Sequence, residues 1–164
     1  MFFSAGTRST TKKIQDGVFS TVAFPIGIFV TVIFWGIWMI DRNFVFPAVL
    51  DQYYPSYINH FMHTSSLPLQ ILEQILKNHT YPSKKIGALS TLGFSSIYIL
   101  WISFIAYYGG FWVYPLFGIL ARTPRIIFMI FCALLTTVFY FVGYLMNLCI
   151  WNSNQDKSKE MKQT

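Results

Sequence analysis

Charged side chains are scarce in this chain. They make up 11% of its 164 residues, whereas a soluble domain averages about 25%. Apolar residues instead reach 54% and aromatic residues 20%. A chain of this length cannot bury so much apolar surface in one core, so lipid must cover part of it. The composition therefore argues against an ordinary soluble domain and predicts an integral membrane protein.

Cysteine is also nearly absent, with only Cys132 and Cys149 present. Both fall in one predicted helix, where a rise of ~1.5 Å per residue separates them by roughly 25 Å. A disulfide needs the two Cα atoms within about 7 Å. No disulfide between them is expected, and the sequence does not indicate a redox compartment.

Long stretches without charge define the expected fold. Four segments of about bilayer length are predicted as transmembrane helices: 18–40, 57–76, 86–108 and 126–151. They form one domain over 18–151, preceded by a polar segment at 1–17 and followed by a polar tail at 152–164, which we expect to lack regular structure. An apolar piece at 111–120 is expected to be re-entrant or interfacial. The predicted class is all-α: a polytopic transmembrane helical bundle with about four spans.

Basic residues give the chain a net charge of +6 and are unevenly distributed. Most lie at the two ends and in the loop after the second span: Arg8, Lys12, Lys13, Lys77, Lys84, Lys85, Lys157, Lys159 and Lys162. The other two connections hold only Arg42, Arg122 and Arg125. Because basic loops stay in the cytosol, both termini are predicted to be cytosolic, in an endomembrane or the plasma membrane. This clustering indicates membrane topology and no nucleic-acid partner.

The second predicted span carries a polar stripe. On a helical wheel its polar side chains share one face, opposite an apolar one. The stripe consists of Asn59, His63, Ser66, Gln70, Glu73 and Gln74, with His60 at its edge. Lipid cannot satisfy such groups, so the stripe must face protein or a water-filled cavity. Ionisable residues there indicate a functional site, and Pro68 is expected to distort the helix.

Several chemistries fit a histidine in this stripe. A structural hydrogen bond between helices is one, a proton relay involving Glu73 is another, and a general base for a hydroxyl nucleophile is a third. Haem ligation is disfavoured because His60, His63 and His79 all belong to one span and its loop. Zinc is disfavoured because Glu73 lies ~15 Å further along the axis. No metal or cofactor is therefore predicted. Ser66 shares the face of His63 but lacks a Gly-x-Ser-x-Gly context.

Several separate motifs resemble the androgen-induced gene-one family. They are Ala23, Phe24, Pro25, Gly27 and Phe29; Asp41 and Arg42; Asn59, His60, Met62, His63 and Thr64; Tyr81, Pro82 and Ser83; Trp112, Val113, Tyr114 and Pro115; and Arg125, Ile126, Ile127 and Phe128. They occur in the right order from about Lys12 to Trp151. The resemblance implies a multi-pass hydrolase that cleaves fatty acid esters of hydroxy fatty acids with a threonine nucleophile and a histidine. The family histidine maps onto His63, the predicted catalytic residue.

The resemblance also implies an N-terminally shortened member. Family members have about two further spans before the matching region, and the nucleophilic threonine lies in the first of them; Thr21 and Thr31 do not match its motif. We therefore expect little hydrolase activity from this chain alone. Without the additional spans, His63, Gln70 and Glu73 are expected to lack partners. The chain would then be poorly stable as a monomer, form a homo-oligomer through that face, or admit water there.

The expected function is thus a lipid-ester hydrolase that takes its substrate among membrane lipids and lacks its nucleophile in this chain. The alternative is a non-enzymatic multi-pass membrane protein, either a transporter-like scaffold or a regulatory subunit. In the hydrolase interpretation, Trp35, Trp101 and Trp112 are candidates for lining an acyl cavity, although packing or interface anchoring is the favoured role for each of them.

Overall fold

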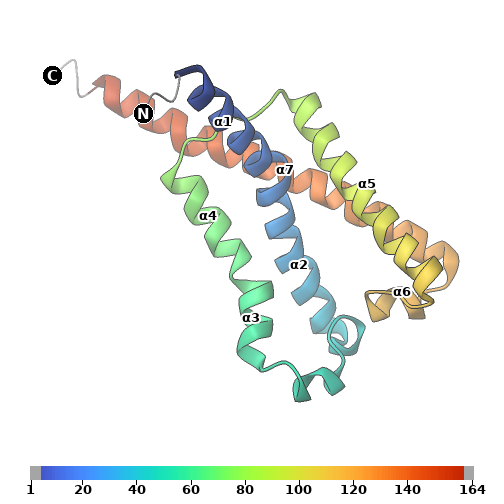
Figure 1. Ribbon diagram of the computed structural model, residues 1–164. Helices are drawn as coiled ribbons and strands as arrows, with labels where there is room; N and C mark the ends of the chain where they lie inside the picture. The colour runs from blue at the N-terminus through green and yellow to red at the C-terminus, as the bar shows by residue number, and fades with distance from the viewer. Residues whose placement is uncertain (1–4, 161–164) are drawn as a thin grey trace.

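The computed structural model describes residues 5–160, and its regular elements are helices throughout that range (Figure 1). They are α1 (Ala5–Val18), the π-helical turn η1 (Phe19–Ala23), α2 (Phe24–Ile40), the 3₁₀ turns η2 (Arg42–Phe44) and η3 (Ala48–Gln52), α3 (Ser56–Thr64), α4 (Ser66–Leu76), α5 (Lys84–Gly109), α6 (Pro115–Ile119) and α7 (Arg122–Glu160). The predicted all-α class is confirmed.

Within residues 5–160, three helical stretches are long and apolar enough to cross a membrane: Thr10–Ile40, Lys84–Gly109 and Arg122–Trp151. They contain three of the four predicted spans, namely 18–40, 86–108 and 126–151. A bilayer requires about 20 apolar residues in a helix, and each of these stretches exceeds that length. The chain is therefore an integral membrane protein with a helical bundle.

The remaining predicted span, 57–76, is not one helix. It is divided into α3, with 9 residues, and α4, with 11 residues, and the two meet at Ser65. Pro68 has no N–H to donate to the carbonyl of Thr64, so the helical ladder is interrupted as the sequence predicted. The Ser65 hydroxyl donates instead to the carbonyl of Phe61. Each half is shorter than a bilayer-spanning helix.

Both ends of the chain carry more helix than the sequence indicated. The polar segment 1–17 is helical from Ala5 onward and continues through η1 into α2. Over 152–164, where no regular structure was expected, α7 continues to Glu160, and 161–164 lie outside the described residues. Residues 152–160 contain no glycine or proline, so nothing in this stretch breaks the helix that precedes it.

α2 lies at the centre of the bundle, between the α3–α4 pair and α5, and α7 packs across it (Figure 1). Two glycines allow the close helix crossings. A Cβ atom at Gly87 of α5 would lie 1.9 Å from the hydroxyl of Tyr140, and one at Gly143 of α7 would lie 2.5 Å from the ring of Phe24. Small residues at such crossings let helices approach each other in membranes.

Candidate functional site

The polar stripe of α3 and α4 faces protein, as predicted. Ser66 Oγ lies 3.0 Å from Thr31 Oγ1 and donates to the carbonyl of Gly27 at 3.2 Å. About two turns further along α4, Gln74 is fully buried and its Nε2 donates to the carbonyl of Gly143 at 3.1 Å. These contacts fix α4 against α2 and α7.

The expectation that this face would be uncovered is wrong for most of the stripe. Gly27 and Gly143 carry no side chains, so the polar residues reach their backbone. The side chain of Gln70 fills the space at Gly27, where a Cβ would lie 2.7 Å from Gln70 Cγ. Glu73, at the edge, lies 3.6 Å from the Lys77 ammonium. Helices α2 and α7 thus supply the cover that we expected to come from additional spans.

His63 is held differently from its stripe neighbours. Its ring stacks on Phe34 of α2, with centroids 3.7 Å apart and planes 2° from parallel. Its Nδ1 atom is buried and has no hydrogen-bond partner among the described residues. One turn earlier, Asn59 is 6% exposed and its Oδ1 is likewise buried without a partner. A buried imidazole nitrogen without a partner is free to accept or donate a proton.

The two histidines of the motif occupy different places. His60 is exposed, and its ring packs against Trp35 at 5.1 Å. His63 instead lines a partly open cavity of about 430 Å³ whose other lining residues come mainly from α2, α5, α6 and α7. The prediction that His63 is the central histidine and His60 the peripheral one agrees with this placement.

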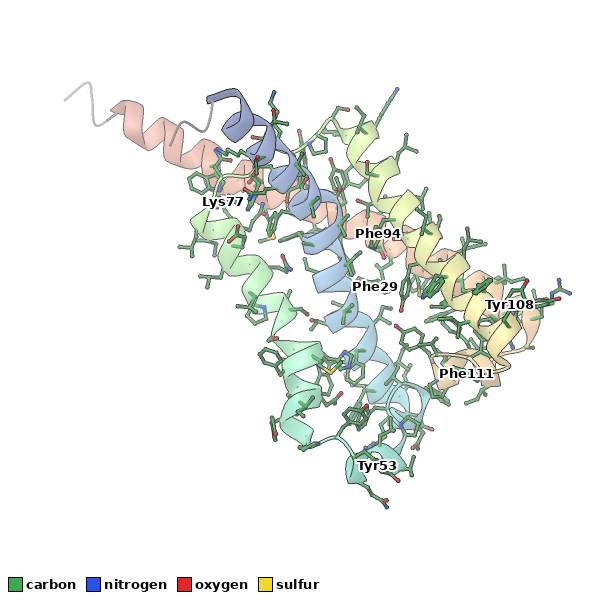
Figure 2. The ribbon with its side chains drawn as sticks, in the orientation of Figure 1. Phe29, Tyr53, Lys77, Phe94, Tyr108 and Phe111 are labelled. Atoms are coloured by element: carbon green, nitrogen blue, oxygen red, sulfur yellow. The ribbon has the colours of Figure 1, made fainter. Side chains whose placement is uncertain are left out.

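The cavity wall is almost entirely apolar. Phe29 of α2 and Phe94 of α5 lie on facing sides of it (Figure 2). The hydroxyls of Tyr98 and Tyr114 hydrogen-bond to each other at 2.7 Å. The other polar lining residues are His63, Ser95, Cys132 and Thr136. Such a compartment suits an apolar ligand and offers few partners to water.

None of the three tryptophans that the sequence suggested lines this cavity. Trp35 packs against Trp38 and His60, Trp101 is 57% exposed, and Trp112 lies against Phe117 with the Arg125 guanidinium 4.4 Å from its ring. Phenylalanines take their place because they lie on the inward faces of α2, α5 and α7. The tryptophan assignment to an acyl cavity is therefore wrong for this compartment.

The hydroxyl groups near the stripe are already engaged. Thr21 Oγ1 donates to the carbonyl of Gly17 at 2.8 Å, within its own helix. Ser66 and Thr31 bond to each other and to Gly27. Among the side chains that the structure describes, no hydroxyl bonds to Nδ1 of His63. Ser66 and Thr21 are therefore structural hydroxyls here and do not form a nucleophile–base pair with His63.

A second polar cluster escaped the sequence analysis. Asp16 and His79 are each 1% exposed, and Asp16 Oδ1 lies 3.0 Å from His79 Nδ1. The His79 ring stacks on Phe19 at 3.9 Å, and its Nε2 lies 3.4 Å from Glu73 Oε1. The cluster joins the first helix to the loop after α4. The only signal in the sequence was a single carboxylate, Asp16, at the border of a long apolar segment.

Acidification should destabilise the fold through His79. Burial lowers the pKa of His79 below its ordinary value of 6.5, although the hydrogen bond to Asp16 acts in the opposite direction. Because the unfolded chain binds the proton more readily, the stabilising contribution is complete above pH 6.5 and is lost as the pH falls through the lower pKa of the folded state. We expect the melting temperature in lipid nanodiscs to fall between about pH 7 and pH 5. His79→Gln should flatten this dependence; an unchanged slope would contradict it.

The long apolar helices of this bundle define a multi-pass membrane protein. A histidine lies on the wall of its apolar cavity. Residues 5–148 match the family described as FAR-17a/AIG1-like protein, and the chain belongs to this family. The resemblance noted in the sequence is thereby confirmed.

Three relatives show the extent of the match. The chain is 34% identical to the human Androgen-induced gene 1 protein over 151 residues. This match covers 92% of this chain and 63% of that protein. It is 39% identical over 141 residues to the mouse Androgen-dependent TFPI-regulating protein, covering 86% and 61% respectively. It is 33% identical over 148 residues to the human protein of that name, covering 90% and 64%. The chain thus spans less than two thirds of these relatives. No solved structure matches it.

Proposed function

We propose that His63 is the general base of a membrane hydrolase that cleaves fatty acid esters of hydroxy fatty acids. One observation carries the proposal: His63 lines an apolar cavity, and its buried Nδ1 atom has no hydrogen-bond partner among the described residues. The position of His63 in the family motif supports it. The test is ester turnover after His63→Ala, compared with His60→Ala.

In this mechanism the nucleophile is a threonine hydroxyl from outside the described residues. Its oxygen attacks the ester carbonyl, and His63 accepts the hydroxyl proton. The C–O bond to the alcohol then breaks, His63 returns the proton to the leaving hydroxy fatty acid, and an acyl-threonine remains. Water hydrolyses that ester in a second step with the same proton exchange. Stacking on Phe34 fixes the plane of the imidazole during both steps.

A regulatory, non-enzymatic role is the second candidate. Two of the relatives are named for regulating TFPI, and the stripe residues Ser66 and Gln74 have their hydrogen bonds satisfied within the bundle. Residues satisfied in this way hold helices together and need no ligand. This candidate predicts that His63 variants change the amount of folded protein, and that neither they nor the unaltered protein hydrolyse the ester.

We propose further that both termini are cytosolic. The start of α1, the loop after α4 and the end of α7 lie at the same end of the bundle, and α6 lies toward the other (Figure 1). The basic loop residues Lys77, Lys84 and Lys85 are at that shared end, in agreement with the positive-inside rule.

Epitope tags at either terminus should therefore become accessible to antibody when only the plasma membrane is permeabilised. The positive-inside rule supplies the reason, and immunofluorescence after selective permeabilisation is the measurement. A tag that stays protected would overturn this orientation, and so would glycosylation of Asn78, which begins an Asn-x-Thr sequon in the same loop.

A further inference from the structure

The cavity beside His63 has a closed wall on its far side. Ile102, Phe117 and Met129 line it there, are only 3–7% exposed, and form one buried apolar cluster. Ile99, Trp112 and Phe128 pack against these three residues, and Ile99 and Phe128 line the cavity beside them. We call Ile102, Phe117 and Met129 the end cluster. Because its members are buried and packed against one another, a ligand cannot extend past them without displacing packed atoms.

His63 lies across α2 from the end cluster. It is carried by α3, whereas the cluster comes from α5, α6 and α7, on the opposite side of α2 (Figure 1). The cavity thus has one wall with an imidazole and another made of hydrocarbon. A ligand that fits both walls has a polar group at one end and an apolar chain at the other.

The volume and polarity of the cavity narrow the ligand class. About 430 Å³ lies within the range of roughly 300–1,000 Å³ that is typical of ligand sites. One tyrosine hydroxyl donates to the other, which leaves one hydroxyl proton between them for a ligand, enough for a single polar group. Long apolar helices surround the cavity, and acyl chains are the apolar ligands present at bilayer concentrations. A charged or sugar-like ligand would lose its hydration without replacement partners.

We propose that this cavity binds a single fatty acyl chain, with its carboxyl or ester end at His63 and its methyl end against the end cluster. The end cluster then sets the length of chain that the protein accepts. The assignment of an ester to the His63 end rests on the proposed hydrolase function, whereas binding of the chain itself does not.

Ala133 and Leu134 provide a matched pair of positions on α7. Ala133 lines the cavity one turn after Met129 and is 7% exposed. Leu134 is its neighbour in sequence, is 54% exposed and does not line the cavity. A phenylalanine at 133 fills the cavity, and a phenylalanine at 134 projects outward at the same depth.

The experiment is photolabelling of the full chain in nanodiscs with hexadecanoic acid that carries a terminal diazirine and an alkyne. Ala133→Phe should lower labelling about tenfold, the change that corresponds to roughly 1.4 kcal/mol of lost affinity. Leu134→Phe should label like the unaltered chain. Met129→Ala should shift the best competitor among unlabelled fatty acids to a longer one. In the unaltered chain, mass spectrometry should place the label on residues of the end cluster or on the cavity-lining residues Phe128, Cys132, Ala133 and Thr136.

Each result decides the proposal. Equal labelling of the Ala133→Phe and Leu134→Phe variants, with unchanged melting temperatures, would overturn it. If Ala133→Phe lowers the melting temperature, the label position in the unaltered chain decides: label confined to outward-facing residues such as Leu134 sinks the proposal. Correct labelling together with normal ester turnover in His63→Ala would leave the acyl site standing and remove the hydrolase function.

Discussion

Replacing His63 by alanine should abolish ester hydrolysis and leave the amount of protein in the membrane nearly unchanged. Loss of a positioned general base typically lowers a rate by about 10²–10⁴-fold. His63 makes no hydrogen bond through Nδ1 in the described structure, so its removal costs the fold mainly the ring stack on Phe34. The measurement is turnover of a labelled hydroxy fatty acid ester by a form that includes the threonine-bearing segment of the family.

His60→Ala is the matched control, because His60 lies one turn away in the same helix and its exposed ring packs on Trp35. Its loss should reduce turnover much less. The regulatory interpretation gains if His63→Ala keeps near-normal turnover. It also gains if that variant fails to accumulate while His60→Ala accumulates normally, since the imidazole would then be a packing group.

Gly87→Ala should strongly destabilise the bundle. The added methyl would lie 1.9 Å from the hydroxyl of Tyr140, a side chain with no exposed surface. Tyr140 cannot withdraw easily, because its hydroxyl donates to the carbonyl of Pro82 and its ring contacts Phe141. Overpacking of this kind costs about 1–3 kcal/mol, and the helices α5 and α7 must separate to relieve it. Thermal unfolding monitored by loss of the monomer peak is the measurement.

Gly93→Ala on the same helix provides the comparison. A Cβ at Gly93 meets nothing within 4 Å, and alanine is a better helix former than glycine by roughly 0.5–1 kcal/mol. This variant should match or slightly exceed the stability of the unaltered chain. Equal melting temperatures for the two variants would show that the α5–α7 crossing adapts to the extra methyl.

Hydropathy was sufficient to predict three of the four spans, because each is a single long apolar helix that lipid requires. Pro68 was sufficient to predict a distortion in the remaining span, 57–76. The division into α3 and α4 could not be inferred, since it depends on whether neighbouring residues compensate for a missing N–H. Nothing in the sequence distinguishes Gly87, where an added Cβ would meet Tyr140, from Gly93, where it would meet nothing within 4 Å. That difference depends on which residue of α7 lies opposite.

The helical wheel predicted which face of the second span is polar but not what covers it. A wheel gives directions within one helix and no information about the helix across the interface. For the same reason, the contact between Asp16 and His79 was not predicted: the residues are 63 positions apart in the chain. The catalytic role proposed for His63 came from the motif, whereas its position on the cavity wall depends on Phe34 of another helix. Tertiary contacts of this kind leave no periodic signal in the sequence.

The break at Ser65 separates two segments that are attached by different kinds of contact. α4 is fixed near its C-terminal end by Gln74, whose side chain bonds to Gly143 and Tyr81 and whose carbonyl accepts from the Trp151 indole. α3 is held to α2 by the stacking of imidazoles on aromatic rings and by one exposed hydrogen bond, from the Trp35 indole to Thr64 Oγ1. Stacked rings can slide and separate at lower free energy than a buried hydrogen-bonded junction. We therefore expect α3, which carries both histidines, to separate from the bundle at lower free energy than α4. Opening at the break between them would admit a long ligand to the cavity without unfolding the bundle.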